Sequence, residues 1–397
     1  MAWVRGLKGA CAMATSISGS IPEAIPGHDS TSPDPTPSVA PEFKPAHIDA
    51  LTSPRFLFGL YVLVKHAGWS AMKELNLLPK PIDTFMSNAE VSISYFFTMS
   101  GFVLAYVYLN KFQQKGALGR YARARFSRVY PVFFLSLILL LPFMKLVSLS
   151  YDLPQFFLLQ SWIPLALSDG SLVSNWNMQS WTLSVELFCY ISFPWTLRFF
   201  EQMSTRAIVV CTLATCVLML ALRLPGIDNA THVLFQWQTY LPYPLLRWPE
   251  FVYGVLLAIL YRRGVAPKSP MLMHILIVVI GVVLFTVHSQ WLYGPLAVLC
   301  GIVILLLTTS SGSSPLNAIL THPLAVMLGR ASYSLYILQL PIYLILHEAF
   351  PTGWFGKLAY VPLMIGVSIA VFFLYEEPMH RWLRGAKPKK MAAPLTT

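Results

Sequence analysis

The sequence predicts an all-α protein, a polytopic membrane helical bundle of about ten transmembrane helices. Hydrophobic residues make up 56% of the 397 residues and charged residues only 11%, and the mean hydropathy is +0.60, which is typical of integral membrane proteins. Apolar runs long enough to cross a bilayer recur along the chain. The third observation is the distribution of basic residues, which concentrate in alternate connections between these runs.

The basic residues also predict the orientation. If the N-terminus is cytoplasmic, ten spans put 19 of the 28 lysine and arginine residues on the cytoplasmic side. We therefore expect an integral multi-pass protein with both termini in the cytoplasm, in the plasma membrane or the inner membrane of a bacterium. This topology explains much of the net charge of +11, so we expect a lipid bilayer and not a nucleic acid as partner.

The chain divides into three parts. Residues 1–50 are rich in Pro, Ser, Thr and Ala without apolar periodicity, which predicts a disordered cytoplasmic tail. Residues 51–380 form the predicted membrane domain, and residues 381–397 a basic cytoplasmic tail. In the segment 150–179, the apolar stretch 156–162 is too short to span, so it lies in the interface or re-enters the membrane. The predicted spans are roughly 54–72, 90–110, 129–149, 180–198, 206–223, 246–261, 271–288, 291–309, 324–347 and 358–377.

Cysteine usage points to core packing. Four of the five cysteines, Cys189, Cys211, Cys216 and Cys300, lie in apolar runs, and Cys11 lies in the tail. Their spacing matches neither a metal site nor a disulfide framework. We interpret the four as small core residues and expect no metal.

The first predicted span contains Arg55 and His66, two ionisable residues that are costly within a membrane. Eleven residues of α-helix turn through about 1100°, roughly 20° more than three turns, so the two side chains share one face. They lie about 16 Å apart along the axis, about half the hydrocarbon thickness. A cation at the membrane edge could bind the anionic end of a carrier molecule. An imidazole at mid-depth could then take part in a reaction at the carrier's other end. Lys65 points to another face, and we expect it to be interfacial.

Five separated stretches resemble the acyltransferase family 3 of membrane proteins, in the family's order. The resemblance implies transfer of an acyl group from acyl-coenzyme A (acyl-CoA) to a hydroxyl of a glycan, lipid or small natural product. Family members often carry a histidine where this chain has Gln339, which cannot take a proton at neutral pH, so we assign it no catalytic role. The stretches are Arg55-x10-His66, Phe96-Phe-Thr-Met-Ser-Gly-Phe102, Arg125-Phe-Ser-Arg128-Val-Tyr-Pro131, Trp181-Thr-Leu-Ser-Val-Glu186-Leu-Phe-Cys-Tyr190, and Leu328-Gly-Arg-Ala-Ser-Tyr-Ser-Leu-Tyr336 followed by Glu377-Pro378.

Two residues are the expected catalytic groups. His66 is the general base that takes the proton of the acceptor hydroxyl; the alternative is a histidine hydrogen-bonded in the core. Glu186 either orients the His66 imidazole, as the acid of a catalytic triad does, or binds the acceptor hydroxyl. The remaining interpretation of Glu186 is a structural ion pair with an arginine, because an unpaired carboxylate in a span is costly.

Arg55, Arg125 and Arg128 are the expected binding residues for the phosphates of CoA, because guanidinium groups match phosphate oxygens in bidentate fashion. The carrier would then be anchored at the cytoplasmic rim, with its arm reaching His66. Arg125 and Arg128 are alternatively ordinary cytoplasmic basic residues. Acyl-CoA is a donor substrate in this scheme, and no permanently bound cofactor is expected.

Candidate acceptor contacts surround two span ends. Asn175, Trp176 and Trp181 lie at the start of the fourth span, where aromatic faces can stack on sugar rings or simply anchor the interface. Arg247 and Glu250 open the sixth span, either as a structural ion pair or as acceptor contacts.

Two further groups receive structural interpretations. Ser100 with Gly101 is interpreted as a small-residue packing contact and not as a nucleophile. Glu376 and Glu377, at the end of the tenth span, are expected to form ion pairs at the interface with the nearby Arg381 and Arg384.

The sequence thus supports two hypotheses of different classes. The first is a membrane O-acyltransferase that uses acyl-CoA, with acetyl the expected acyl group by family analogy. The second is a multi-span transporter or flippase without chemistry, although the halves of the chain show no repeat of the kind that transporters often carry. A family member that only binds acyl-CoA or a glycan is a third reading.

Overall fold

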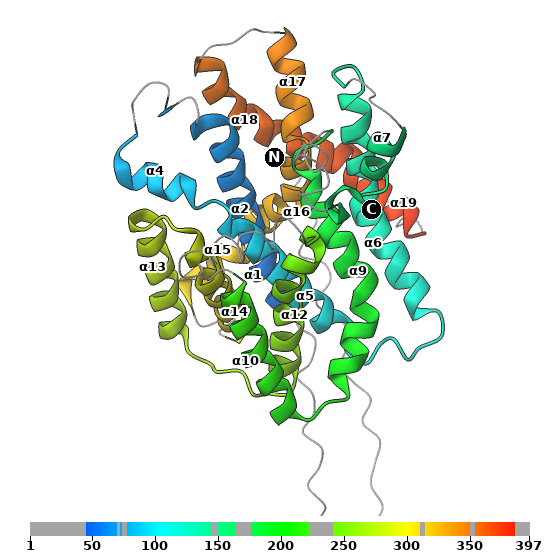
Figure 1. Cartoon of the computed structure of the whole chain (residues 1–397), viewed down its shortest axis with the longest axis vertical. Helices are drawn as coiled ribbons and strands as arrows, with labels where there is room; N and C mark the ends of the chain where they lie inside the picture. Colours follow the sequence, from blue (N-terminus) through cyan, green and yellow to red (C-terminus); the bar gives the residue numbers. More distant parts are fainter. Residues whose placement is uncertain are drawn as a thin grey trace, which may run out of the picture. The chain divides into compact units, whose positions relative to one another are not determined.

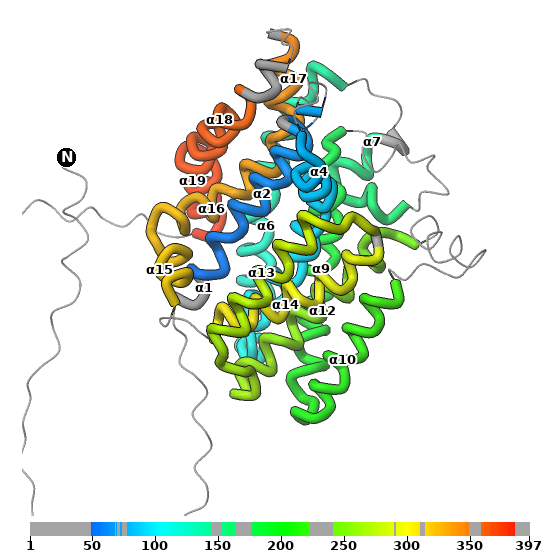
Figure 2. Tube along the Cα trace, turned by 90° about the vertical axis from the view of Figure 1, so that its left-hand side faces the viewer, coloured from blue at the N-terminus to red at the C-terminus, as the bar shows by residue number. Residues whose placement is uncertain are grey.

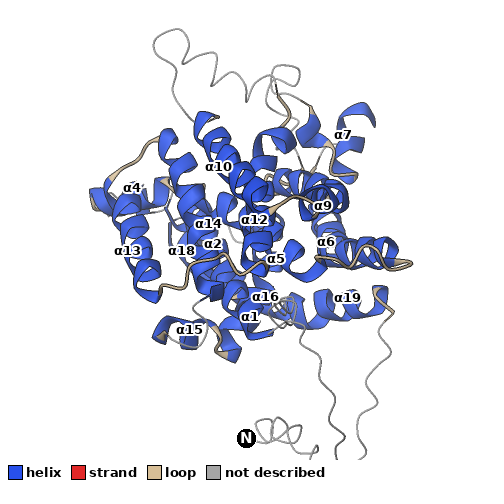
Figure 3. Ribbon diagram, turned by 90° about the horizontal axis from the view of Figure 1, so that it is seen from below, coloured by secondary structure: helices blue, strands red, loops and turns tan. Residues whose placement is uncertain are grey.

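Every regular element in the described part of the chain is a helix (Figure 1), and Figure 3 shows no strand there. The computed structural model describes residues 45–69, 72–73, 78–144, 149–163, 176–222, 241–309, 314–349 and 354–385. These helices belong to one compact unit, Ala40–Thr397. The all-α prediction is confirmed.

The helices keep the labels of Figure 1, and the short π and 3-10 segments are labelled η. The first group is α1 (Pro45–Thr52), α2 (Pro54–Leu63), the π-helical η2 (Val64–Trp69), α4 (Lys80–Ser87), α5 (Val91–Tyr108), α6 (Ala117–Leu140), α7 (Leu149–Phe156), the 3-10 turn η3 (Gln160–Trp162), α9 (Ser180–Glu201) and α10 (Thr205–Ala221). The second group is α12 (Tyr243–Arg262), α13 (Pro270–Thr286), the 3-10 turn η5 (Gln290–Leu292), α14 (Tyr293–Thr309), α15 (Pro315–Leu320), α16 (Pro323–Ile337), α17 (Gln339–Ala349), α18 (Trp354–Val371), the π-helical η6 (Phe372–Glu376) and α19 (Glu377–Leu383).

Each predicted span overlaps one helix or a run of adjoining helices. Two helical stretches in the described part are long and apolar enough to cross a membrane, Val91–Tyr108 and Ala359–Leu383. Helices α10, α13 and α14 are apolar but have only 17 residues each, at the lower limit of about 17–25 for a spanning helix. The number of crossings therefore stays a prediction.

Two predicted boundaries differ from the structure. Helix α1 crosses the boundary at residue 50, and Ala50 and Leu51 are buried, so the end of the predicted tail belongs to the folded unit. Helix α6 begins at Ala117 and not near residue 129, because good helix formers follow Gly116, whose left-handed φ of 73° suits glycine. Stretch 156–162 ends α7 and forms η3, and Gln160 donates to Ser180 Oγ at the start of α9 (2.9 Å).

Two prolines free backbone carbonyls that other side chains then satisfy. Pro341 has no N–H to donate to the Ile337 carbonyl, and α16 ends at Ile337. Asn177 Nδ2 donates to that carbonyl instead, at 3.0 Å. In α9, Pro194 likewise leaves the Tyr190 carbonyl open, and the Tyr121 hydroxyl donates to it at 2.9 Å. These bonds tie α9 to α6 and to the break between α16 and α17.

The closest approach between helices occurs at small residues. A Cβ on Gly101 of α5 would overlap the Phe251 carbonyl of α12, and a Cβ on Gly254 would overlap the Thr98 carbonyl. The two helices therefore touch through their backbones and form the most extensive helix pair of the bundle. Gly329 of α16 packs in the same way on Thr52, next to the start of α2.

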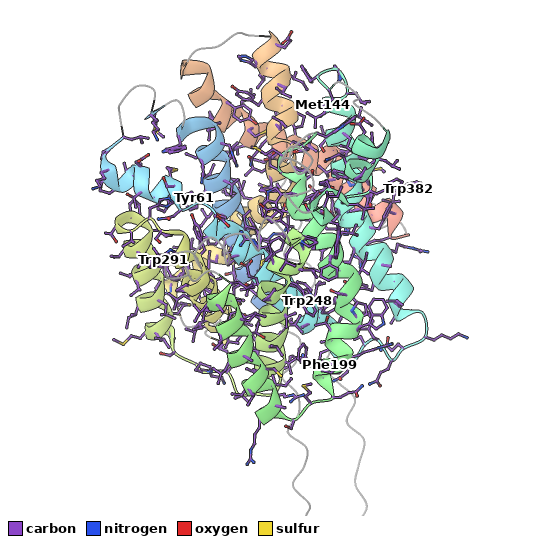
Figure 4. All side chains as sticks on the ribbon, viewed as in Figure 1. Tyr61, Met144, Phe199, Trp248, Trp291 and Trp382 are labelled. Atoms are coloured by element: carbon purple, nitrogen blue, oxygen red, sulfur yellow. The ribbon has the colours of Figure 1, made fainter. Side chains whose placement is uncertain are left out.

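The outer helices keep apolar side chains on their exposed faces. In Figure 2, α18 and α10 lie at opposite ends of the described helices. Val210 of α10 is 65% exposed and Met271 of α13 is 74% exposed, although both helices are apolar all round. Phe199 and Trp382 also extend away from the ribbon (Figure 4). Such helices need an apolar partner or lipid around them.

Candidate active site

One cavity of about 140 Å³ brings together the three arginines that the sequence singled out, and we call it the arginine cavity. Arg55 comes from the start of α2, and Arg125 and Arg128 lie one turn apart on α6. Glu186 of α9 also lines it. The lining therefore carries three guanidinium groups and one carboxylate, a net positive site suited to an anion.

Arg55 and Arg125 are only partly satisfied by the protein. The Nε atoms of both are buried, and neither has a hydrogen-bond partner among the described residues. The Arg125 guanidinium lies over the Tyr190 ring, 5.6 Å from its centroid. A buried donor without a partner costs free energy unless a ligand accepts from it. These two arginines are thus prepared for an anionic ligand.

Arg128 is held by protein partners. It forms an ion pair with Glu376 of η6, which is 2% exposed, and it lies over the Tyr333 ring at 5.7 Å. Glu376 also accepts from Ser334 Oγ at 2.5 Å. The expected ion pairing with Arg381 or Arg384 is therefore wrong for Glu376, but it is confirmed for Glu377, which pairs with Arg381. Successive helix residues point about 100° apart, so the neighbouring Glu377 accepts from Arg381 Nε (2.8 Å) while Glu376 faces α6.

Glu186 accepts a hydrogen bond from the Tyr190 hydroxyl one turn later on α9. In the part of the chain that the structure describes, no hydrogen bond joins Glu186 to His66, and the two residues line different cavities. Glu186 thus lies in the same cavity as the three arginines, and its role stays a prediction.

His66 lines a second cavity of about 360 Å³, which we call the histidine cavity. His66 and Lys65 come from η2, Glu90 precedes α5, and Trp181 opens α9. The His66 side chain is solvent-accessible. Tyr243 and Arg247 at the start of α12 complete the polar and aromatic part of the lining.

The π-helical segment η2 explains why Lys65 lines the same cavity. The α-helical pattern predicts that Lys65 points to another face of the helix than His66, yet both residues line this cavity. In a π-helix the bonds run from i to i+5, so each residue turns through a smaller angle and neighbours diverge less. Lys65 Nζ donates to the Ser87 carbonyl (3.3 Å) at the end of α4.

Arg247 and Glu250 form an ion pair, which was one of the two roles expected for them. Arg247 is 4% exposed and pairs with Glu250 (2.9 Å) and with Glu90. Ser94 Oγ donates to Glu250 Oε1 at 3.0 Å, while Glu250 Oε2 is buried without a partner among the described residues. Arg247 also lies over the Trp181 ring, 5.9 Å from the centroid, so it both braces the histidine cavity and lines it.

The two cavities adjoin along the bundle and share a wall. Four helices line both: α2, α5, α9 and α16. Along the chain, α2 and α16 reach the arginine cavity first, whereas α5 and α9 reach the histidine cavity first. Ile93 and Tyr336 line both cavities. A ligand that occupies both would therefore pass these two side chains.

The profile of a family described as "Acyltransferase domain" matches residues 49–377, across both cavities. The chain belongs to this acyltransferase family. "Acyltransferase MdmB" from Streptomyces mycarofaciens is 25% identical over 195 residues, which cover 44% of this chain and 47% of that relative. The chain thus spans about half the length of the curated relative that it matches. No solved structure matches the chain.

The family is one of enzymes, which favours acyl transfer over the transporter hypothesis. In the described residues of this acyltransferase, no three His, Cys, Asp or Glu side chains group as metal ligands. Cys189 and Cys300 are buried as expected, and Cys211 and Cys216 are half-buried.

The aromatic residues predicted to contact the acceptor differ in where they lie in the acyltransferase. Trp181 lines the histidine cavity and packs on Tyr243, with ring centroids 5.4 Å apart. Trp176 does not line it: this side chain is 1% exposed, and its Nε1 donates to Asp152 Oδ1 at 2.9 Å, so its position in the core overturns the expectation. Asn175 lies outside the described residues.

Sequence reasoning missed Glu90 and Tyr336. Glu90 is an acidic residue at the edge of the second apolar run, a position where a carboxylate is costly and therefore worth attention. Tyr336 ends the fifth family-like stretch, but nothing in its spacing distinguishes it from Tyr333. Ser100 lines the arginine cavity, whereas Gly101 makes the packing contact expected of the pair.

Proposed function

We propose that the protein is a membrane O-acyltransferase that moves an acyl group, by expectation acetyl, from acyl-CoA to a hydroxyl of a glycan, lipid or secondary metabolite. The observation that carries the proposal is the adjacency of a cavity with three arginines and a cavity with a histidine. The first suits the anionic carrier, and the second suits the acceptor. The wall between them is where the acyl group changes partner.

The arginine cavity fits part of the donor. A volume of about 140 Å³ is room for roughly five water molecules, enough for a phosphate group or the arm of the carrier but not for the whole nucleotide. Arg55 and Arg125 would donate to phosphate oxygens. Arg128, already paired with Glu376, would contribute chiefly its charge.

In the proposed reaction His66 is the general base. One imidazole nitrogen takes the proton of the acceptor hydroxyl as the hydroxyl oxygen bonds to the thioester carbonyl carbon. The carbon–sulfur bond then breaks, and the thiolate of CoA receives a proton from the imidazolium. The products are the ester and free CoA, and His66 ends in its starting state.

Glu186 acts in this scheme as the counter-charge of the arginine cavity. Its carboxylate reduces the mutual repulsion of three guanidinium groups before the donor binds, and Tyr190 fixes its position. The orienting of His66, one of the roles considered from sequence, has no supporting contact.

The acceptor would bind in the histidine cavity. Trp181 and Tyr243 offer aromatic faces to a sugar or lipid-linked ring, and Glu90 and Arg247 offer polar groups to its hydroxyls. Glu250 supports Arg247 from the core. Asn175 stays a predicted contact.

The membrane topology proposed from the basic residues is supported by helix direction. With both termini cytoplasmic, α2 and α16 run outward, and α5 and α9 run inward. In all four, the residues of the arginine cavity then fall nearer the cytoplasm, where acyl-CoA is made. The exposed apolar faces of α10 and α13 are those expected of helices in lipid.

The test compares wild type with His66→Ala in a host that lacks the protein, at matched membrane levels. Surface glycans, lipids and secreted metabolites are surveyed by mass spectrometry for acyl-sized mass differences. We expect the modification with wild type and a decrease of about 10²–10⁴-fold with His66→Ala, because a positioned base contributes that much. His347→Ala is the matched control, since His347 is an exposed histidine on α17 that lines neither cavity.

Equal modification by wild type and His66→Ala would remove His66 as the base. The absence of any acyl-sized difference between the wild-type strain and the empty host would reject the three proposed acceptor classes.

A further inference from the structure

We propose that Tyr336 is a movable partition that separates the donor thioester in the arginine cavity from His66 in the histidine cavity. The inference rests on the proposed function and adds a residue that controls it. With the ring in place, water activated by His66 does not reach the thioester. With the ring displaced, the acyl group meets the acceptor.

The lining of the two cavities identifies the partition. Of the described residues, Ile93 and Tyr336 are the two that line both. Ile93 is buried within α5, whose backbone is fixed against α12 at Gly101. Tyr336 is half-buried and carries the larger side chain, so its ring is the part of the wall that can move.

The Tyr336 side chain contacts helices α9 and α5. The Tyr336 hydroxyl is hydrogen-bonded to Thr182 Oγ1 at 3.2 Å, and the ring lies against Phe96 at 6.4 Å between centroids. Thr182 lines the arginine cavity, while its neighbour Trp181 lines the histidine cavity. The bond therefore attaches the ring to α9 at the level where α9 passes from one cavity to the other.

The backbone beside Tyr336 is interrupted. Helix α16 ends one residue later, at Ile337, because Pro341 removes the next helical bond. Sharp kinks in helices occur at prolines, so the chain can bend at this point. The position thus suits a residue that changes orientation during a reaction cycle.

Removal of the ring would open a defined side reaction. His66 would take a proton from water, the water oxygen would bond to the thioester carbonyl carbon, and the carbon–sulfur bond would break. The departing thiolate would receive a proton from the imidazolium. The products are the free acid and the thiol of CoA, formed without any acceptor.

The experiment measures this hydrolysis directly. The full chain in lipid nanodiscs is given acetyl-CoA without acceptor, and release of free thiol is followed. We expect Tyr336→Ala to release thiol several-fold faster than wild type, and Tyr336→Phe, which keeps the ring but loses the bond to Thr182, to fall between the two. Ile93→Ala opens the same wall from α5 and should move in the same direction. Tyr343→Ala on α17 is the control, since Tyr343 lines neither cavity.

A double variant, His66→Ala with Tyr336→Ala, tests where the hydrolysis occurs. Its rate should return to the wild-type level, because water then lacks the base. If Tyr336→Ala and Ile93→Ala both release thiol at the wild-type rate, the partition is wrong. It is also wrong if the double variant releases thiol as fast as Tyr336→Ala alone.

The two proposals fail differently. Suppose that wild type acylates an acceptor in the host survey but Tyr336→Ala and Ile93→Ala hydrolyse acetyl-CoA no faster than wild type. Then only the partition is wrong. If wild type neither binds acetyl-CoA nor acylates an acceptor, the proposed function is wrong and the partition falls with it.

Discussion

The three arginines of the arginine cavity differ in what already binds them. Arg128 has a buried carboxylate partner, so its charge is largely compensated before any ligand arrives. Arg55 and Arg125 each keep a buried Nε without a partner in the described part of the chain. An anion that accepts from these groups relieves a cost already present in the folded protein. We therefore expect these two arginines to dominate donor affinity.

Arg125→Gln tests this expectation. It should weaken acetyl-CoA binding by about tenfold to a hundredfold, because a hydrogen bond to a charged group contributes about 1.5–3 kcal/mol. Calorimetry in nanodiscs at fixed ionic strength measures the change. The matched control is Arg123→Gln, an exposed arginine two residues earlier on the same helix. Equal weakening by both variants would mean that the membrane-surface charge, and not the cavity, attracts the donor.

At the same scale, sequence could identify costly residues but not their partners. Arg55 and Glu186 were found because ionisable groups in apolar runs need a reason. Arg125 and Arg128 were found through the resemblance to the acyltransferase family, and the structure brings all four to one cavity. Trp176 shows the limit, since its burial depends on Asp152, 24 residues away in the chain. No local pattern specifies such a contact.

At the scale of elements, the site depends on how closely α5 and α12 approach. Gly101 follows Ser100 of the arginine cavity, and Arg247 of the histidine cavity lies on α12. Because backbone atoms occupy the space beside both Gly101 and Gly254, an added methyl group has no side chain to displace. The positions of both cavities thus depend on the backbone contact between α5 and α12.

Gly101→Ala and Gly254→Ala should each destabilise the acyltransferase by about 1–3 kcal/mol, the usual cost of overpacking. Thermal unfolding in one detergent, with wild type alongside, measures the loss. Gly281→Ala on α13 is the control, because a Cβ there meets no atom within 4 Å. It should match or slightly exceed wild type, since alanine favours the helix by about 1 kcal/mol over glycine. If all three variants are equally stable, Gly101 and Gly254 are not needed for the close packing of α5 on α12.

The π-helical segments are the elements that sequence could not predict. Apolar periodicity is read at the α-helical angle, and within 64–69 that angle no longer applies. Lys65 was therefore not expected to line the same cavity as His66. By contrast, the order and type of the helices followed from the length of the apolar runs, where the signal is summed over many residues.

At the scale of the whole molecule, the direction of the four shared helices and the proposed topology assign opposite sides of the membrane to the two cavities. Exposed residues near each side make this testable. We expect Lys73→Cys, just after η2, to react with a membrane-impermeant thiol reagent in intact cells. Arg123→Cys on α6 should react only after permeabilisation. The unsubstituted protein is the background control, and the reverse pattern would invert the topology and move the arginine cavity to the outer side.

The proposed binding of the carrier phosphates in the arginine cavity has a consequence for turnover. In the proposed reaction the guanidinium groups hold phosphates, a part of the carrier that acyl transfer leaves unchanged. Substrate and spent carrier are then retained about equally, because uniform binding does not distinguish them. Free CoA would compete with the donor as it accumulates. The rate would then follow the cell's ratio of acylated to free carrier and not the amount of donor alone, which links modification at the outer surface to the metabolic state inside.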